Sequence, residues 1–406
     1  MIFDVERYRK DFPILAQRIH GHPLAYLDSA ASAQKPRAVI DAMTHFMEND
    51  YSNIHRGVHE LSQRATAMYE AVRPRIQRFI NADYEDEIVF TRGATESINL
   101  VAQTWGRKFL KAGDEVLITA LEHHANIVPW QILRDQIGIV LRVVPITPEG
   151  EVRVEDVNAA LSSQTKLVSV AHVSNVLGTI LPVKEIAALA HKAGALVLID
   201  GAQSISHLPV DVRDMDADFF VFSGHKLYGP TSTGVLYGKR GILKTMPPYQ
   251  GGGDMIASVT FAETTFKEPP HRFEAGTPPI TEVIGLGAAI DYVSAIGMQN
   301  IATHENELLS YATDRLLPIK GLHIVGTAAK KSGIVSFIMD QAHPHDIGTI
   351  LDRSGVAIRA GHHCAQPLME HLGLVATARA SFGLYTNRKD IDALVEAVNK
   401  VQEIFG

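Results

Sequence analysis

The most constraining feature of this 406-residue chain is a regular alternation of short apolar runs with segments of helical periodicity. The strands that these runs predict span residues 87–91, 115–119, 141–146, 166–173, 195–200, 218–223 and 234–238. Helical patterns lie between them, for example over 96–110 and 183–194. Such alternation is typical of a parallel sheet covered by helices. We therefore expect an α/β fold with a large domain built on a mainly parallel sheet.

The last part of the chain has a different pattern. Residues 259–280 show little periodicity and are rich in proline, threonine and charge, so we expect an extended loop there. Helical patterns over 281–296 and 300–317 precede strands near 333–340, 355–361 and 378–385 and a closing helix over 389–405. We expect a large domain over residues 26–297 and a smaller α+β domain made of residues 1–25 and 298–406.

The charge and the cysteine count exclude several classes of protein. A net charge of −7, without a long Lys/Arg stripe, argues against a nucleic-acid-binding protein. The chain has one cysteine, Cys364, so no internal disulfide can form and no oxidising compartment is needed. Its first residues include charges, unlike a signal peptide, and no apolar run approaches the roughly 20 residues that span a bilayer. We expect a cytoplasmic protein without a membrane segment.

Polar and glycine-containing segments follow five of the predicted strands. Ligands of open α/β sheets bind beyond the carboxyl ends of the strands, so these segments are candidates for one site. They carry Thr95, His123, Asn175, Asp200, Gln203, Ser223, His225 and Lys226. Each feature alone is weak evidence, because a loop histidine or a strand-terminal aspartate is usually structural. Their occurrence at five strand ends favours a functional site.

One cofactor chemistry uses all of these residue types. A lysine near a phosphate site can form a Schiff base with pyridoxal 5′-phosphate (PLP), and an aspartate deep in the sheet can keep the pyridine nitrogen protonated. A histidine can lie against the ring, while Ser, Thr and His donors hold the phosphate. A metal site is the weaker alternative, because the adjacent histidines of "EHH" and "HHC" lack the i, i+4 spacing of helical ligands. We expect PLP and no metal.

The motifs around these residues resemble a known family. "DGAQ" and "SGHKLYGP" resemble the fold-type I PLP enzymes of the aminotransferase class V group. Further motifs along the chain resemble those of the class II, SufS-type cysteine desulfurases. They are "YLDSAASAQKP", "NIHRGVHELS", "TRGATESINLVA", "EHHANIVPW", "HVSNVLGT", "RFEAGTP" and "RAGHHCAQP". Two departures are visible. Ala94 stands where such enzymes often carry Thr, which removes one hydroxyl near the phosphate, and the order within "LYTNRKDID" is unusual.

The resemblance implies roles for the residues at the cofactor ring. Lys226 is expected to hold the cofactor and to move the Cα proton of L-cysteine. His123 is expected to stack on the ring and to take part in proton transfer. Asp200 is expected to pair with the pyridine nitrogen, and Gln203 to form a hydrogen bond with the ring hydroxyl.

The resemblance also implies two further sets of ligands. The phosphate is expected to be held by Thr95, Ser223, His225 and, from a partner subunit of a homodimer, Thr277. The substrate carboxylate is expected to be bound by Arg379, a task that suits guanidinium geometry, with Asn175 assisting. Arg359, His55 and Arg56 are expected to line the same cavity.

Cys364 is the single candidate for a sulfur-carrying nucleophile. Its neighbours in "RAGHHCAQP" are polar and basic, which favours a reactive thiolate over a buried core cysteine. The resemblance implies that it takes the sulfur of L-cysteine as a persulfide, leaving L-alanine. The short loop implies transfer to an acceptor protein of the SufE or SufU type for iron–sulfur cluster assembly. A selenocysteine lyase is the nearest alternative, and a class V aminotransferase would have no need of Cys364.

Overall fold

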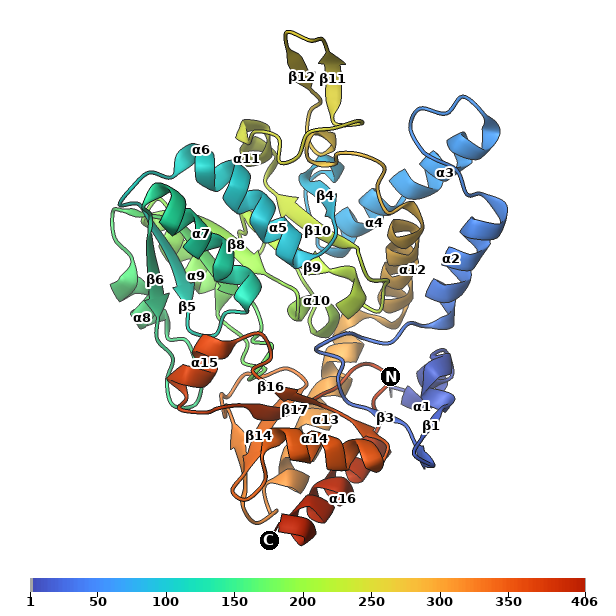
Figure 1. Cartoon of the computed structure of the whole chain (residues 1–406), viewed down its shortest axis with the longest axis vertical. Coiled ribbons are helices and arrows are strands. Elements are labelled where there is room, and N and C mark those ends of the chain that lie inside the picture. Colours follow the sequence, from blue (N-terminus) through green and yellow to red (C-terminus); the bar gives the residue numbers. More distant parts are fainter. Residues whose placement is uncertain (1–2, 406) are drawn as a thin grey trace.

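The computed structural model describes residues 3–405, and its largest element is a seven-stranded sheet (Figure 1). The strand order is β4 (Ile88–Thr91), β10 (Gly234–Gly238), β9 (Phe219–Ser223), β8 (Leu196–Asp200), β7 (Thr165–Ala171), β5 (Glu115–Thr119) and β6 (Val140–Val144). β10 pairs antiparallel with both of its neighbours, and the strands from β9 to β6 pair in parallel. The prediction of a mainly parallel sheet is confirmed.

Helices cover both faces of this sheet, because its central strands are apolar on both sides. Phe219 and Val221 of β9 pack in one core with residues of α5 (Ala94–Val101) and α7 (Val128–Ile137). Phe220 and Phe222 pack in a second core with residues of α4 (Val72–Phe79), α9 (Val183–Lys192) and α12 (Ile280–Ile296). Successive side chains of a strand point to opposite faces, so one strand serves both cores.

The remaining elements of this region lie around the sheet or at its ends. The N-terminal helices are α1 (Val5–Arg9), α2 (Arg37–Asn49) and α3 (Glu60–Glu70), and the short strands β1 (Arg18–Ile19) and β2 (His22–Pro23) form a small hairpin. A π-helical segment (Ala102–Gly106) continues α5 into α6 (Arg107–Phe109). The shorter helices are α8 (Val154–Ala160), α10 (Ser204–His207) and α11 (Arg240–Thr245).

The last part of the chain forms a four-stranded sheet. Its order is β13 (Leu322–Val325), β14 (Ile334–Met339), β17 (Thr377–Ser381) and β16 (Arg359–Gly361). It packs with α13 (Met298–Leu316), α14 (Pro344–Arg353) and α16 (Arg388–Phe405), and α15 (Gln366–His371) follows β16. The sequence patterns anticipated β14, β17 and α16 but not β13, which is a short edge strand with a half-exposed pattern.

The N-terminal segment packs against this C-terminal region. β3 (Ala25–Tyr26) pairs in parallel with β15 (Val356–Ala357), and Leu27 is buried in the same core as α16. Gly297, with a φ of +90°, separates α12 from α13, and the two helices are bent by 75°. These contacts are compatible with the predicted domain division, which stays a prediction. Residues 1, 2 and 406 of the predicted smaller domain lie outside the described part of the chain.

The expectation of an extended loop over 259–280 is wrong in part. β11 (Ile256–Val259) and β12 (Thr264–Phe266) form an antiparallel hairpin that projects from the body of the molecule (Figure 1). Its side chains are nearly all exposed, so no alternation of buried apolar and exposed polar residues marks the two strands in the sequence. Over residues 3–405, no single helix is long and apolar enough to cross a membrane, although the bent pair α12–α13 passes that test by length and composition.

Candidate active site

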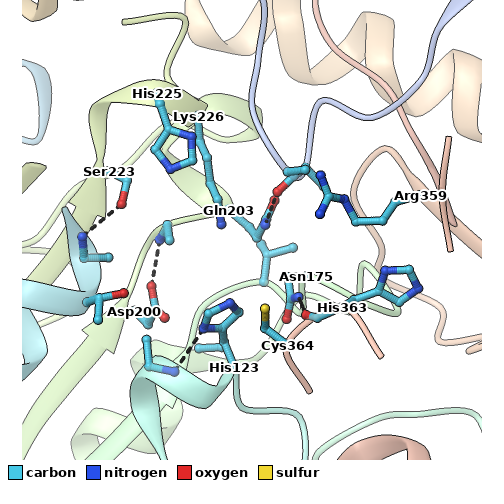
Figure 2. Close-up of a pocket in the computed structure, with 18 of the residues that line it drawn as sticks. His123, Asn175, Asp200, Gln203, Ser223, His225, Lys226, Arg359, His363 and Cys364 are labelled. Carbon is cyan, nitrogen blue, oxygen red and sulfur yellow. Dashed lines mark hydrogen bonds between the residues drawn. The ribbon is translucent and has the colours of Figure 1, made fainter. Parts of the chain in front are cut away.

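A cavity of about 240 Å³ lies at the carboxyl ends of β7, β8 and β9. Segments far apart in the sequence meet there, as Figure 2 shows. Of the residues predicted from the sequence, the cavity is lined by Thr95, His123, Asn175, Asp200, Gln203, Ser223, His225, Lys226, Arg359, Cys364 and Arg379. The fold therefore brings the strand-end residues together with residues of the C-terminal sheet.

Lys226 and Asp200 hold opposite charges inside the cavity. Desolvation lowers the pKa of Lys226 to about 8, and the negative charge of Asp200 opposes that shift. Burial raises the pKa of Asp200, while the N–H of Ala202, which donates to its Oδ1 at 2.9 Å, and the charge of Lys226 lower it. A cation next to Asp200 is favoured because it would stabilise the buried carboxylate.

The N-terminus of α5 forms the anion-binding end of the cavity. Gly93, with a φ of +155°, lets the chain turn from β4 into the helix, and the N–H of Ala94 donates to Ser223 Oγ at 2.9 Å. Thr95 follows in the first turn and lines the cavity. N–H groups and hydroxyls at a helix N-terminus suit a phosphate. His225 joins them, and its Nδ1 lies 3.2 Å from Ser32 Oγ.

His123 is held as a neutral ring. Burial and the positive charge of Lys226 lower its pKa to about 3, and its Nδ1 accepts a hydrogen bond from the N–H of Ala125 at 3.0 Å. The preceding residue, Glu122, is buried and ties the turn to β7, because its Oε2 accepts from the N–H of Ala171 at 2.9 Å. A neutral, fixed imidazole can lie flat against an aromatic cofactor.

The Cys364 loop is attached to residues that follow two strands of the large sheet, His124 after β5 and Asn175 after β7. The N–H of His124 donates to the Cys364 carbonyl at 2.7 Å, and Asn175 Nδ2 donates to the His363 carbonyl at 2.6 Å. His363 and Cys364 both have positive φ angles, 54° and 55°, so the loop makes a tight turn that presents the thiol. Cys364 is solvent-exposed and also lines the cavity. The thiol can therefore meet both an enclosed substrate and an external acceptor.

Two arginines form the wall near this loop. Arg379 is 2% exposed, and its Nη1 donates to the Asn175 carbonyl at 2.7 Å while its Nε has no partner among the described residues. Arg359 and Arg379 both pair with Asp28. A buried guanidinium with an unpaired N–H is suited to a carboxylate ligand.

The donors of this cavity fit PLP. Lys226 supplies an amine whose lowered pKa favours reaction with an aldehyde, and Asp200 supplies a buried carboxylate for a pyridinium. The α5 N-terminus with Ser223 suits the phosphate, and His123 suits the ring face. Gln203 Nε2 already donates to the Ala30 carbonyl at 2.9 Å, so its second N–H or its oxygen remains for a ring hydroxyl.

A family comparison agrees with this geometry. Residues 25–394 match the model of the aminotransferase class V family. The chain belongs to that family. The matched range includes every candidate cofactor-binding, substrate-binding and catalytic residue that the sequence analysis named.

Several curated relatives and a solved structure that are similar to this chain over nearly its whole length are cysteine desulfurases. The cysteine desulfurase of Pectobacterium atrosepticum is 51% identical over 407 residues, with 100% of both chains covered. That of Synechococcus elongatus is 51% identical over 98% of this chain, which spans only 64% of that relative's length. The crystal structure of the cysteine desulfurase CsdA from Escherichia coli superposes with a TM-score of 0.93 at 38% identity and covers 100% of both chains.

Three of the predicted site residues, His55, Arg56 and Thr277, do not line the cavity in the single chain. His55 Nε2 lies 2.8 Å from Glu70 Oε1, and Arg56 Nε lies 3.1 Å from Asp254 Oδ1. The expectation that His55 and Arg56 line the cavity does not hold within one chain, because α3 and the hairpin segment hold them elsewhere. Thr277 is exposed outside the cavity, and its role toward a partner subunit stays a prediction.

Asp28 and His363 were missed by the sequence analysis. Asp28 belongs to the motif "YLDSAAS", and the need to balance the charge of two arginines is the signal that could have found it. His363 is buried, and its Nε2 lies 2.9 Å from Thr377 Oγ1. Its position next to Cys364 in "HHC" marked it as a neighbour of the nucleophile, but its contact with β17 is visible only in the structure.

Proposed function

We propose that this protein is a PLP-dependent cysteine desulfurase of the SufS type. It converts L-cysteine to L-alanine and carries the sulfur as a persulfide on Cys364. The observation that carries the proposal is that Cys364, the one thiol of the chain, lines the same cavity as Lys226 while remaining open to solvent. The similarity to curated cysteine desulfurases over the full chain supports it.

PLP, when bound, withdraws electrons from the Cα of an amino acid and so makes its Cα proton acidic and its sulfur open to attack. Arg379 binds the substrate carboxylate through its unpaired Nε and thereby orients the amino acid. The Lys226 amine accepts the Cα proton, since its pKa of about 8 lets it exchange protons near neutral pH. The Cys364 thiolate then forms an S–S bond with the substrate sulfur while the Cβ–S bond breaks. The electron pair of the broken bond stays with the carbon skeleton, which takes up protons to become alanine.

The short, anchored Cys364 loop supports transfer to a dedicated acceptor protein. The loop runs from the end of β16 at Gly361 to the start of α15 at Gln366, and His124 and Asn175 hold its backbone. A thiol fixed in this way cannot travel far from the cavity, so the acceptor must come to it. We propose an acceptor of the SufE or SufU type, with iron–sulfur cluster assembly as the destination of the sulfur.

The test is the substitution Cys364→Ser in the PLP-loaded enzyme. We expect persulfide formation and sulfur release to stop, because a hydroxyl is a much weaker nucleophile than a thiolate. The visible absorbance should still change on addition of L-cysteine, since substrate binding and Cα deprotonation need only PLP, Lys226 and Arg379. Mass spectrometry of the wild-type enzyme should find one added sulfur on the peptide that contains Cys364.

Two controls separate the possible failures. Lys226→Ala should abolish turnover and the covalent attachment of PLP, while Cys364→Ser should retain that attachment. Selenocysteine is a second substrate to compare, because selenium leaves more readily than sulfur, and we expect its release to depend less on Cys364. Full desulfurase activity of Cys364→Ser with an acceptor present would contradict the proposal.

A further inference from the structure

Glu122 is a buried carboxylate that the proposed reaction does not use. It is 1% exposed, and over residues 3–405 no Lys, Arg or His side chain forms an ion pair with it. Three hydrogen bonds hold it instead. Thr119 Oγ1 donates to its Oε1 at 2.6 Å, while Asn126 Nδ2 and the N–H of Ala171 donate to its Oε2 at 2.7 and 2.9 Å. Because Thr119 ends β5 and Ala171 ends β7, the carboxylate joins two strands of the large sheet.

The turn that Glu122 holds carries two histidines of the site. His123 follows it directly and lines the cavity together with Cys364 (Figure 2). His124 comes next and holds the Cys364 loop at two points. Its N–H donates to the Cys364 carbonyl at 2.7 Å, and its Nε2 accepts from the N–H of Gln366 at 3.0 Å. The position of the imidazole and that of the thiol loop thus both depend on this turn.

We propose that Glu122 is a positioning residue for the reaction, and that its hydrogen bonds fix both His123 against the cofactor ring and the Cys364 loop beside it. The inference rests on the proposed function and deepens it. Glu122 does not itself line the cavity, so it acts through the two histidines that follow it in the chain.

The hydrogen bonds of Glu122, and not its negative charge, are what this role requires. Burial raises its pKa to about 7, and the like charge of Asp200 raises it as well, so the site also accommodates the protonated acid. Glutamine has the shape of that acid. Its oxygen can accept from Asn126 and Ala171, and its amide can donate to Thr119 Oγ1. Glu122→Gln should therefore keep the turn in place, whereas Glu122→Ala leaves three buried donors without an acceptor.

The test compares the two variants as PLP-loaded enzymes. In Glu122→Ala the visible circular dichroism of the bound cofactor should change, because His123 no longer holds one orientation. Amide hydrogens of the peptide 361–371 should exchange about tenfold faster or more, since His124 no longer fixes that loop. For L-cysteine, kcat should fall by about tenfold to a hundredfold, while KM stays within about twofold because Arg379 still binds the carboxylate. Glu122→Gln should match the wild-type enzyme in all three measurements.

A matched control is Glu87→Ala. Glu87 is also buried, at 4% exposed, and its carboxylate accepts three hydrogen bonds from backbone N–H groups. It precedes β4, at the edge of the sheet opposite to the cavity. Its removal should lower the stability of the fold but leave the cofactor dichroism, the exchange of residues 361–371 and kcat unchanged.

If Glu122→Ala does not fold, Thr119→Val carries the test. It removes one of the three hydrogen bonds and keeps the branched shape of the side chain. The dichroism, the loop exchange and kcat should then change in the same direction as expected for Glu122→Ala, by a smaller amount.

Wild-type dichroism, loop exchange and kcat in Glu122→Ala would overturn the inference, because Glu122 would then support only the fold. A Glu122→Gln enzyme that is as impaired as Glu122→Ala would overturn it too, since the charge would then be the feature that acts. Dichroism and hydrogen exchange require no turnover. A wild-type enzyme that takes no sulfur from L-cysteine would therefore contradict the proposed function, and these two measurements would still decide the role of Glu122.

Discussion

At the scale of single residues, enclosure changes the chemistry of Lys226. Desolvation lowers its pKa from 10.5 to about 8, and the nearby Asp200 charge is the largest effect that opposes this fall. An amine must be neutral to react with an aldehyde, and the neutral form predominates above the pKa. The reactivity of Lys226 toward PLP should therefore rise with pH through about 8.

This residue-scale prediction can be measured on the apoenzyme. The rate of PLP uptake, followed by visible absorbance and corrected for the reaction of a free lysine derivative, should have a midpoint near pH 8. Asp200→Asn should move the midpoint to lower pH, because it removes a negative charge that stabilises the protonated amine. A midpoint near 10.5, or a shift to higher pH in Asp200→Asn, would show that the cavity does not control this amine.

At the scale of elements, a buried ion pair closes the free edge of β4. β4 is the last strand of the large sheet, so its outward backbone groups have no neighbouring strand. Arg73 Nη1 donates to the Ile88 carbonyl at 2.6 Å, and Glu274 Oε1 accepts from the N–H of Phe90 at 2.8 Å. Arg73 and Glu274 also pair with each other at 2.9 and 3.0 Å. The ion pair thus holds the strand that leads into the N-terminus of α5.

Glu274→Ala should destabilise the protein strongly, because it removes the bidentate partner of the buried Arg73, which keeps only the longer contact of its Nε with Glu70 Oε2 at 3.3 Å. Breaking a buried pair in this way costs about 3–5 kcal/mol. Denaturant unfolding of the apoenzyme measures the loss. Glu268→Ala is the control, since Glu268 lies 3.6 Å from Arg272 and is 74% exposed, and it should cost about 1 kcal/mol or less. Equal losses in the two variants would mean that the β4 edge does not depend on the pair.

At the scale of the whole molecule, the β11–β12 hairpin indicates an interface. It projects from the body (Figure 1) and exposes Val259, Phe261 and Phe266. Exposed large apolar side chains that gather on one element are typical of a surface that binds another protein. Thr277, whose predicted partner is a phosphate in another subunit, follows in the same segment. We therefore expect a homodimer that uses this hairpin.

The double substitution Val259→Asp/Phe261→Asp should weaken that dimer. Both side chains are solvated in the single chain, so the fold should persist while burial of two charges in the interface becomes unfavourable. Sedimentation should show a dissociation constant raised by about tenfold or more, and retention of PLP should fall if Thr277 completes the phosphate site. Leu317→Asp, at an exposed apolar residue of the smaller sheet region, should leave the dimer intact. An unchanged dimer would assign the hairpin another role.

Local patterns in the sequence were sufficient to predict the strands of the large sheet and many of the residues that line the cavity. The seven strands lie within two residues of their predicted positions, because runs such as "DFFVFS" are apolar on both faces wherever they are buried. The strand-end residues, among them Asp200, Ser223 and Lys226, were placed together because parallel strands end at one edge. Both inferences use only the pattern of residues that are close together in the sequence.

Contacts between distant segments were decided by the tertiary structure. The exposed β11–β12 hairpin buries neither face, so no alternation of apolar and polar residues marks it in the sequence. His55 and Arg56 are held away from the cavity by Glu70 and Asp254. The union of Asp28 with Arg359 and Arg379 requires the N-terminal segment to lie against the C-terminal sheet. Periodicity reports which face of an element is buried, whereas the side chains that meet across two elements depend on how the whole chain packs.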